Sequence, residues 1–337
     1  MGFSSQAGQV ILKTQSVQGT YDATTGTAGV GIKLRSGSLG TNRDLLLADP
    51  EIGGGRDRVD AYLGAASWSG DYEFYARMDA LTTLLKAALG TAAAPVTTSG
   101  VTTHTLTPSD AAQLPFLSIE EAVGNGLEAY HYNDAVVNTL HLEAEANGFL
   151  MGTAGIVAAK QVAGVTKTVA PVWDNGPMVV GTNITVTYNA VTLPAKSFSL
   201  DINNNFEDDD FRLGSFYVGD LTPKGREVTA SFSIRESSSA LWRQATYGLS
   251  SATEVGGIPT KNQLVITCTT YENISGSTPL TPYSLTITIP SFMLSPYTLE
   301  ASGDDIIESD IEGQALRPVA ATPILTAVVK TGKATIS

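Results

Sequence analysis

One stretch of the sequence, residues 70–90, changes from the period of a strand to the period of a helix and then ends in glycine. Tyr72, Phe74 and Ala76 alternate with polar neighbours, as in a strand with one buried face. After them the apolar residues follow helical spacing in one stripe, which comprises Leu81, Leu84, Leu85 and Ala88. The sequence predicts a strand, a short helix capped by Asp79 and a stop at Gly90.

The same succession returns at residues 225–248, where an alternating strand runs through a serine cluster into a second short helix pattern that ends at Gly248. The flanks repeat in the same order. Residues 36–39 match 197–200, and residues 139–144 match 298–301. These landmarks predict a duplicated domain of about 160 residues, which is an ordinary domain size. The alternative is one larger β domain in which strand and turn patterns recur by chance.

The predicted fold is mainly β, of α+β type, with two tandem β-barrel or β-sandwich domains that each carry one short helix. The boundaries follow the repeat, at 1–160 and 161–337. Residues 1–30 read as an N-terminal arm, and 37–70 as a long loop that a partner orders, since long structureless loops are uncommon in compact domains. Residues 146–180 would join the copies, and residues 324–330 predict a last strand.

The composition excludes several classes of function. The formal charge of −13 repels polyanions and argues against a protein that reads nucleic-acid sequence. The single cysteine, Cys268, excludes an internal disulfide framework and falls on the apolar face of a predicted strand, so we expect a buried thiol. No apolar run is long enough for a membrane helix, and the N-terminus lacks the features of a standard secretion signal. We therefore expect no membrane partner.

Motifs of catalysis are missing, and no enzyme, cofactor or metal is expected. The three histidines fall on different predicted strands. Residues 201–207 carry acidic and amide side chains at alternate positions, but Phe206 occupies the place where a calcium loop needs glycine. Glu143 and Glu145 share one strand face about 7 Å apart, which suits paired carboxylates in glycoside hydrolysis, yet no aromatic sugar platform accompanies them.

The arrangement of these patterns resembles the major tail tube proteins of long-tailed bacteriophages. The likeness rests on the strand at 30–34, the long loop 37–70, the strand and helix of 71–90, the acidic-faced strand at 139–145 and their counterparts in the second copy. It is a likeness of pattern over most of the chain, without a diagnostic motif.

The resemblance implies a structural virion protein that is assembled in the host cytoplasm and resides in the tail. Its domains would contribute strands to a β-barrel shared between subunits, with the helix outside, and rings would stack into a hollow tube through which DNA passes without specific binding. The long loop would reach the adjacent ring with four exposed residues, Leu45, Leu46, Leu47 and Tyr62. The candidates for residues that face the bore are Glu143, Glu145 and Glu300.

The implied partner is the chain itself. Two domains per chain predict a ring of three chains, a pseudo-hexamer; without the duplication, six chains would be expected. Tape measure, tail terminator and distal tail proteins would be further partners. An extracellular β-sandwich adhesin, a surface-layer protein and a carbohydrate-active enzyme remain alternatives, although the first two normally carry a secretion signal or anchor, and the last an aromatic cleft.

Overall fold

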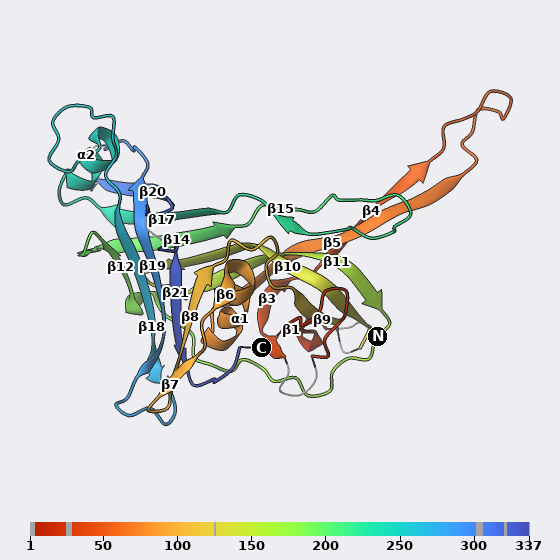
Figure 1. Ribbon diagram of the computed structural model, residues 1–337, viewed down its shortest axis with the longest axis horizontal. Coiled ribbons are helices and arrows are strands. Elements are labelled where there is room, and N and C mark those ends of the chain that lie inside the picture. Colours follow the sequence, from red (N-terminus) through yellow and green to blue (C-terminus); the bar gives the residue numbers. More distant parts are fainter. Residues whose placement is uncertain (1–3, 25–28, 125, 301–305, 320–321, 337) are drawn as a thin grey trace.

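The structure is a computed structural model that describes residues 4–24, 29–124, 126–300, 306–319 and 322–336. It is mainly β, as predicted, with two α-helices, α1 (Met78–Leu89) and α2 (Ala240–Tyr247). Short 3-10 turns lie at Ser5–Ala7 and Gly181–Asn183. A long hairpin projects from one end of the molecule, and the lobe that carries α2 projects from the other (Figure 1).

Strands of the first half form a closed circuit of antiparallel ladders. β1 pairs with β2 and β9, β9 with β10, β10 with β11, β11 with β5, and β5 with β3 and β4. Because β2 leads directly into β3, the circuit returns to its start. These strands are β1 (Gln9–Thr14), β2 (Val30–Ile32), β3 (Leu34–Gly37), β4 (Gly40–Leu47), β5 (Ala61–Tyr75), β9 (Leu117–Val123), β10 (Glu128–Glu145) and β11 (Met151–Ala163).

The second half repeats this succession of ladders. β12 pairs with β13 and β18, β18 with β19, β19 with β20, β20 with β17, and β17 with β14, again all antiparallel. Each of the two helices follows the strand of equivalent position, β5 or β17. The strands are β12 (Ile184–Tyr188), β13 (Val191–Leu193), β14 (Ala195–Asn203), β17 (Glu227–Arg235), β18 (Asn262–Asn273), β19 (Pro282–Leu294) and β20 (Glu308–Ala315).

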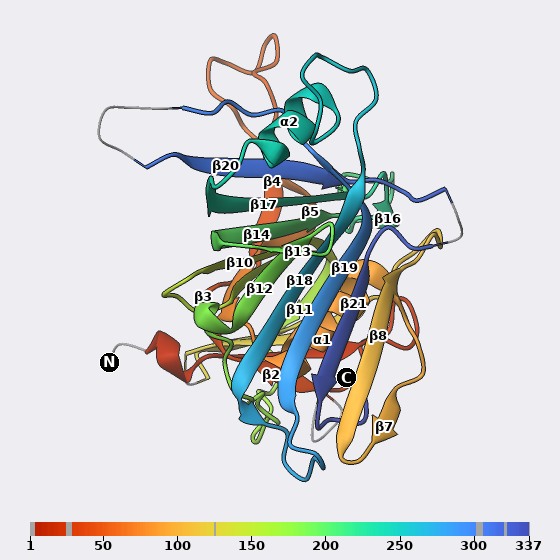
Figure 2. The ribbon, with the colours of Figure 1, turned by 90° about the vertical axis from the view of Figure 1, so that its left-hand side faces the viewer.

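One ladder joins the halves into a continuous sheet, because the end of β10 pairs with β14 from Thr139 opposite Asn203 to Glu145 opposite Ser197. A second extension runs from β19 to β21 and β8. Figure 2 shows β20, β17, β14 and β10 following one another, with β19, β21 and β8 beside them. The remaining strands are β6 (Gly90–Ala92), β7 (Val96–Thr98), β8 (Val101–Pro108), β15 (Phe206–Glu207), β16 (Thr222–Pro223) and β21 (Thr326–Thr331).

The helix α1 is enclosed by the fold. Leu81, Leu84 and Leu85 are fully buried, and the helix contacts strands from β1, β8, β10 and β21. Gly90 ends it with a φ of +99°, as expected for a residue without Cβ. By contrast, α2 buries only Gln244 and Ala245.

The predicted cap of α1 is wrong. The N-cap position is Arg77, and the free N–H of Ala80 donates instead to Oδ2 of Asp174 at 2.7 Å. Asp79 lies within the first turn, where its Oδ1 accepts a hydrogen bond from the Thr331 hydroxyl. A buried carboxylate from a distant segment thus satisfies the helix end, and local sequence gives no sign of such a partner.

Three further expectations need correction. Residues 37–70 are a β-hairpin formed by β4 and β5 rather than an irregular loop. Residues 146–180 contain the long strand β11. The described part of the second-copy landmark, residues 298–300, lies outside any strand, since β19 ends at Leu294. The predicted last strand is confirmed as β21, which pairs within its own chain.

Candidate functional site

The sheet that unites the two halves has one face buried in the main core, whereas its other face is exposed except where a second apolar cluster covers Val136, Val157 and Ala159. Along β5, β11, β10, β14, β17 and β20, the alternate residues that point inward are mostly apolar and belong to one core. The opposite face is acidic. Its carboxylates are Asp71 and Glu73 on β5, Glu143 and Glu145 on β10, Asp201 on β14, Glu227 on β17, and Glu308, Asp310 and Glu312 on β20.

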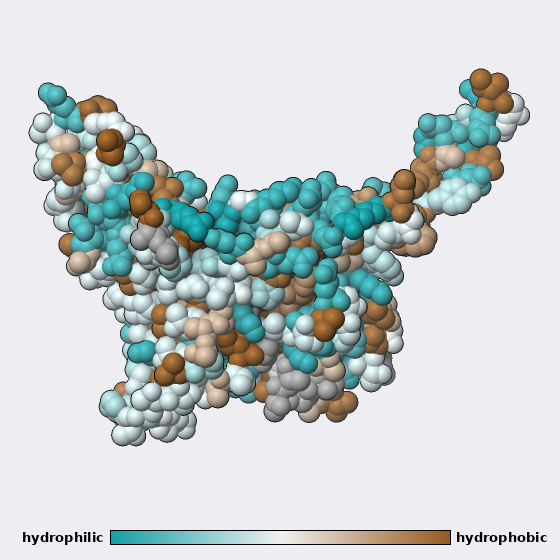
Figure 3. All heavy atoms as spheres, viewed as in Figure 1, coloured by the Kyte–Doolittle hydropathy of each residue, from teal (hydrophilic) through white to brown (hydrophobic). Residues whose placement is uncertain are grey.

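The ladders hold this acidic face in register from one half to the other. Glu143 lies opposite Ser199, which lies opposite Ser231, which lies opposite Glu312. The hydroxyls of Ser199 and Ser231 are 2.8 Å apart and bonded, so small polar side chains fill the space between the acids. In Figure 3 a hydrophilic band runs along the hollow between the α2 lobe and the hairpin.

His141 is the basic group at the joint between the halves. Its Nδ1 lies 2.6 Å from Oδ1 of Asp201, and its Nε2 lies 3.4 Å from Oε2 of Glu143. The hydrogen bond to Asp201 raises the pKa of His141, and the bond to Glu143 acts in the same direction. At the outer end of the face, Arg235 and Lys196 contact Glu308. Most of the other carboxylates on the face lack such a basic neighbour among the described residues.

The three predicted bore residues differ in position. Glu143 and Glu145 are exposed on the acidic face, side by side with the second half of the chain. Glu300 is exposed but lies on the segment after β19, which is not part of a strand. The acids of β5, β17 and β20 on the same face were not predicted; alternation alone names two faces, and only the ladders show which faces are continuous.

The projecting hairpin exposes apolar side chains on both of its faces. Leu45 pairs with Leu63, and Leu46 pairs with Tyr62. Exposed fractions are 58% for Leu45, 54% for Leu46, 47% for Leu47, 65% for Tyr62 and 55% for Leu63. Leu45, Leu46, Leu47 and Tyr62 were predicted as a contact group; Leu63 was not. We call the projecting part of this hairpin, residues 44–65, the arm. A two-stranded ribbon with so much exposed apolar surface needs a partner to cover it.

A buried carboxylate holds the N-terminal strands to the segment after β11. Glu120 of β9 is 1% exposed and accepts hydrogen bonds from Gln9 Nε2 at 2.7 Å and from the N–H and hydroxyl of Thr168 at 2.8 and 2.7 Å. Thr24 donates to it as well, and His131 lies 3.6 Å away. Burial raises the pKa of Glu120, but the hydrogen bonds outweigh burial and lower it to about 2.

Acid should therefore weaken the fold through Glu120. The carboxylate contributes its stability at any pH above its ordinary pKa near 4.5, and that contribution is lost as pH falls toward 2. The shift corresponds to about 3 kcal/mol. We expect Glu120→Gln to be destabilised at pH 7 and to lose less stability than wild type between pH 5 and pH 3 in urea unfolding. Glu143→Gln, at an exposed site, is the control; equal pH slopes for all three proteins would contradict the prediction.

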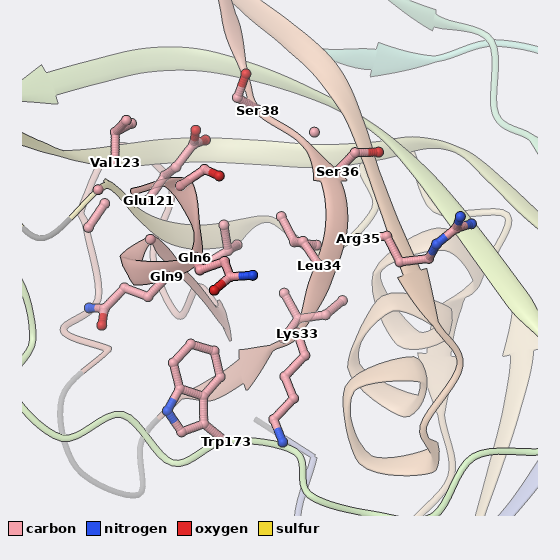
Figure 4. Close-up of a pocket in the computed structure, with 17 residues that line it drawn as sticks. Gln6, Gln9, Lys33, Leu34, Arg35, Ser36, Ser38, Glu121, Val123 and Trp173 are labelled. Atoms are coloured by element: carbon pink, nitrogen blue, oxygen red, sulfur yellow. The ribbon is translucent and has the colours of Figure 1, made fainter. Parts of the chain in front are cut away.

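A cavity of about 680 Å³ opens beside β3. Leu34, Ser36 and Ser38 follow one another along one wall, Gln9 and Glu121 lie on the other side, and further lining comes from Lys33, Arg35 and Trp173 (Figure 4). Glu121 Oε2 accepts hydrogen bonds from the Tyr72 hydroxyl at 2.7 Å and from the Leu39 N–H at 3.2 Å. Burial raises the pKa of Glu121.

The described residues give little support for a metal site, a calcium loop or a reactive cysteine. They contain no group of three or more His, Cys, Asp or Glu side chains arranged to hold a metal. In the segment considered for calcium, the side chain of Asn203 accepts the N–H of Asn205, and Phe206 is buried. Cys268 is buried, and burial raises its pKa to about 12. Among the residues that the structure describes, no helix is long and apolar enough to cross a membrane.

Comparison with known proteins identifies the family. No curated protein matches the chain by sequence. The family model described as phage tail tube protein matches residues 5–315, which include both repeated sets of ladders, the arm and the acidic face. The match covers nearly the whole chain, and the chain therefore belongs to the phage tail tube protein family.

Proposed function

We propose that this protein assembles in the host cytoplasm into rings that stack as the hollow tube of a phage tail, and that DNA passes through its bore. The observation that carries the proposal is the continuous acidic face, which runs across both halves of one chain on six neighbouring strands. Carboxylates repel phosphates, so a bore lined by them lets DNA slide, whereas lysines and arginines would bind it. Glu143 and Glu145 are the central members.

We also propose that residues 1–160 and 161–337 are tandem copies of one tube domain. The matching ladders support this, and a ring of three chains would then present six similar domains. The exposed arm, with Leu45, Leu46, Leu47, Tyr62 and Leu63, would be covered by the adjacent ring. Ends of the tube would meet the tape measure, terminator and distal tail proteins. In this proposal the protein has a structural role without catalysis.

Negative-stain microscopy of the purified protein tests the proposal. We expect tubes with a regular ring repeat, and threefold symmetry with six lobes in end views. A stable monomer at high concentration across a range of salt would overturn the assembly proposal. Rings of six chains, measured by mass, would overturn the tandem arrangement while leaving the tube itself intact.

A further inference from the structure

The two halves can be aligned strand by strand, because their ladders share irregularities. The β3–β5 ladder shifts between Leu34 and Ser36, and the β14–β17 ladder shifts between Ala195 and Ser197. The β9–β10 ladder shifts between Tyr132 and Ala135, and one of the two shifts of the β18–β19 ladder, between Asn262 and Leu264, lies at the equivalent place. A bulge marks one definite position in a strand, so bulges that occur in both halves show which residues of the two halves are equivalent. Leu34 thus corresponds to Ala195.

This alignment shows that equivalent sheet edges differ between the halves: a neighbouring strand pairs with the edge in the second half, and no described strand pairs with it in the first half, where we call it the bare edge. In the second half, the end of β10 covers the edge of β14 that faces away from β17. In the first half, no described strand pairs with the corresponding edge of β3 and β4, which pair only with β5. The counterpart of β10 is β19, which ends at Leu294 and is followed by the extended segment 295–300. The β9–β10 and β18–β19 ladders set an offset of 157 residues between β10 and β19. Carried along the sequence past Leu294, this offset matches Leu142-Glu143-Ala144 with the identical Leu299-Glu300-Ala301.

The cavity beside β3 marks the same difference. Its counterpart in the second half is only about 20 Å³, and Ala144, Glu145, Ala146 and Gly181 form part of its lining. The other residues lining the small cavity are Ile184, Val186, Ala195, Lys196, Ser197 and Phe198. Their six counterparts, Gly8, Val10, Leu34, Arg35, Ser36 and Gly37, all line the 680 Å³ cavity. The two cavities therefore share this lining, and they differ in that residues 144–146, at the end of β10 and just after it, line only the smaller one.

Side chains occupy the bare edge in the single chain. The Leu39 N–H donates to Glu121, and its carbonyl accepts from the Tyr132 hydroxyl at 3.5 Å. In the second half, where a strand covers the edge, the counterparts of Glu121 and Tyr132 are the apolar residues Ile266 and Ile289. Similarly, Tyr72, which bonds Glu121, corresponds to Phe232. At these three positions polar side chains occur only in the half whose edge no described strand covers, and inward-pointing charges are a known protection of free edges.

We propose that the edge formed by β3 and the start of β4 receives the segment Ser295–Glu300 of a second copy, in the register that β10 and β14 adopt within one chain. This places Leu299 opposite Leu39 and Glu300 opposite Ser38, at the mouth of the cavity near Arg35. The inference rests on the proposed ring assembly and specifies its contact. A head-to-tail contact of this kind uses two different surfaces, so repeated contacts build a ring when the rotation between copies closes and a filament when it does not, rather than a two-fold dimer.

Disulfide cross-linking tests the register. Directly opposed residues of antiparallel strands are about 4.5–5.5 Å apart at Cα, which a disulfide spans. We expect oxidised Ser38→Cys/Glu300→Cys protein to give covalent multimers that end at the ring mass on non-reducing gels. Glu143→Cys/Ser199→Cys, the equivalent pair within one chain, should cross-link as a monomer and shows that the geometry permits the bond. Asn42→Cys/Glu300→Cys, displaced by about 13 Å along the strand, should stay uncross-linked.

The outcomes separate this inference from the proposed function. Rings seen by microscopy without a Ser38–Glu300 cross-link, while the Glu143–Ser199 control forms, would overturn the edge pairing alone. A cross-link from Asn42 in place of Ser38 would overturn the register. Wild-type protein that forms no rings would overturn the edge pairing together with the assembly that it serves. The native Cys268 is buried, and each single-cysteine variant controls for its participation.

Discussion

We expect a chain without its arm to form rings that do not stack. Residues 44–65 can be replaced by Asn-Gly, because Arg43 and Ala66 are paired and a two-residue turn joins paired strand positions. The replacement removes Leu45, Leu46, Leu47, Tyr62 and Leu63, each about half exposed, and touches none of the main core. We expect a thermal melting temperature close to wild type, separate rings in micrographs and at least a hundredfold loss of tubes.

The size of this effect follows from the apolar area involved. Burying half of a large apolar side chain contributes about 1 kcal/mol, and five such residues recur in every chain of a ring. The control changes the arm without removing apolar surface. Asp49→Asn/Arg58→Gln breaks an exposed ion pair of 3.1 Å, which is worth at most about 1 kcal/mol, and should leave stacking intact. Tubes of normal length from the armless chain would show that stacking depends on other surfaces.

The arm also shows why part of the fold could not be predicted. Strands are recognised by alternation between a buried and an exposed face, but both faces of the arm are exposed, so Leu45, Leu46 and Leu47 form an uninterrupted apolar run. Pro50 and the glycines from Gly53 then suggest irregular structure, although they occupy only the tip. A ribbon that becomes buried only in an assembly carries no pattern of burial in its own chain.

β11 was missed for the opposite reason. Residues from Ala154 to Ala159 are all buried, so small and apolar residues occupy both faces and no period of two appears. The strand and helix of residues 70–90 were predicted well because Tyr72, Phe74 and Leu84 face one core with strong periodicity. Secondary structure was predicted correctly where a segment has one solvent-exposed face, and incorrectly where both faces or neither face is exposed.

The acidic face was predicted in part. Glu143 and Glu145 were identified because they alternate with Leu142 and Ala144 on one strand. Asp310 and Glu312 alternate with buried residues in the same way, but their alignment with β10 depends on three intervening ladders that sequence does not reveal. The predicted match of 139–144 with 298–301 rests on a shared Thr-Leu pair, whereas the offset used for the proposed edge pairing matches Leu142-Glu143-Ala144 with Leu299-Glu300-Ala301.

Thr41→Pro should prevent ring closure, whereas removal of the arm should prevent only the stacking of rings. The N–H and carbonyl of Leu39 point away from β5, as their hydrogen bonds to Glu121 and Tyr132 show. The direction of the main-chain N–H and carbonyl reverses from each residue of a strand to the next, so those of Thr41 point away from β5 as well. Proline at this position therefore leaves the β4–β5 ladder intact and removes one donor from the bare edge. Such edges tolerate proline, and Gly40 accepts the backbone restriction that proline places on the residue before it.

One lost main-chain hydrogen bond costs about 1 kcal/mol per contact, so a ring of three contacts loses about 3 kcal/mol. That is about a hundredfold in the equilibrium constant of ring assembly, and about tenfold in the protein concentration at which rings form. We expect Thr41→Pro to remain a folded monomer by light scattering under conditions where wild type forms rings. Thr41→Val keeps the N–H and should assemble normally. Because the armless chain should stop at rings and the proline variant at monomers, normal rings from Thr41→Pro would show that β3 and β4 are not the surface that closes the ring.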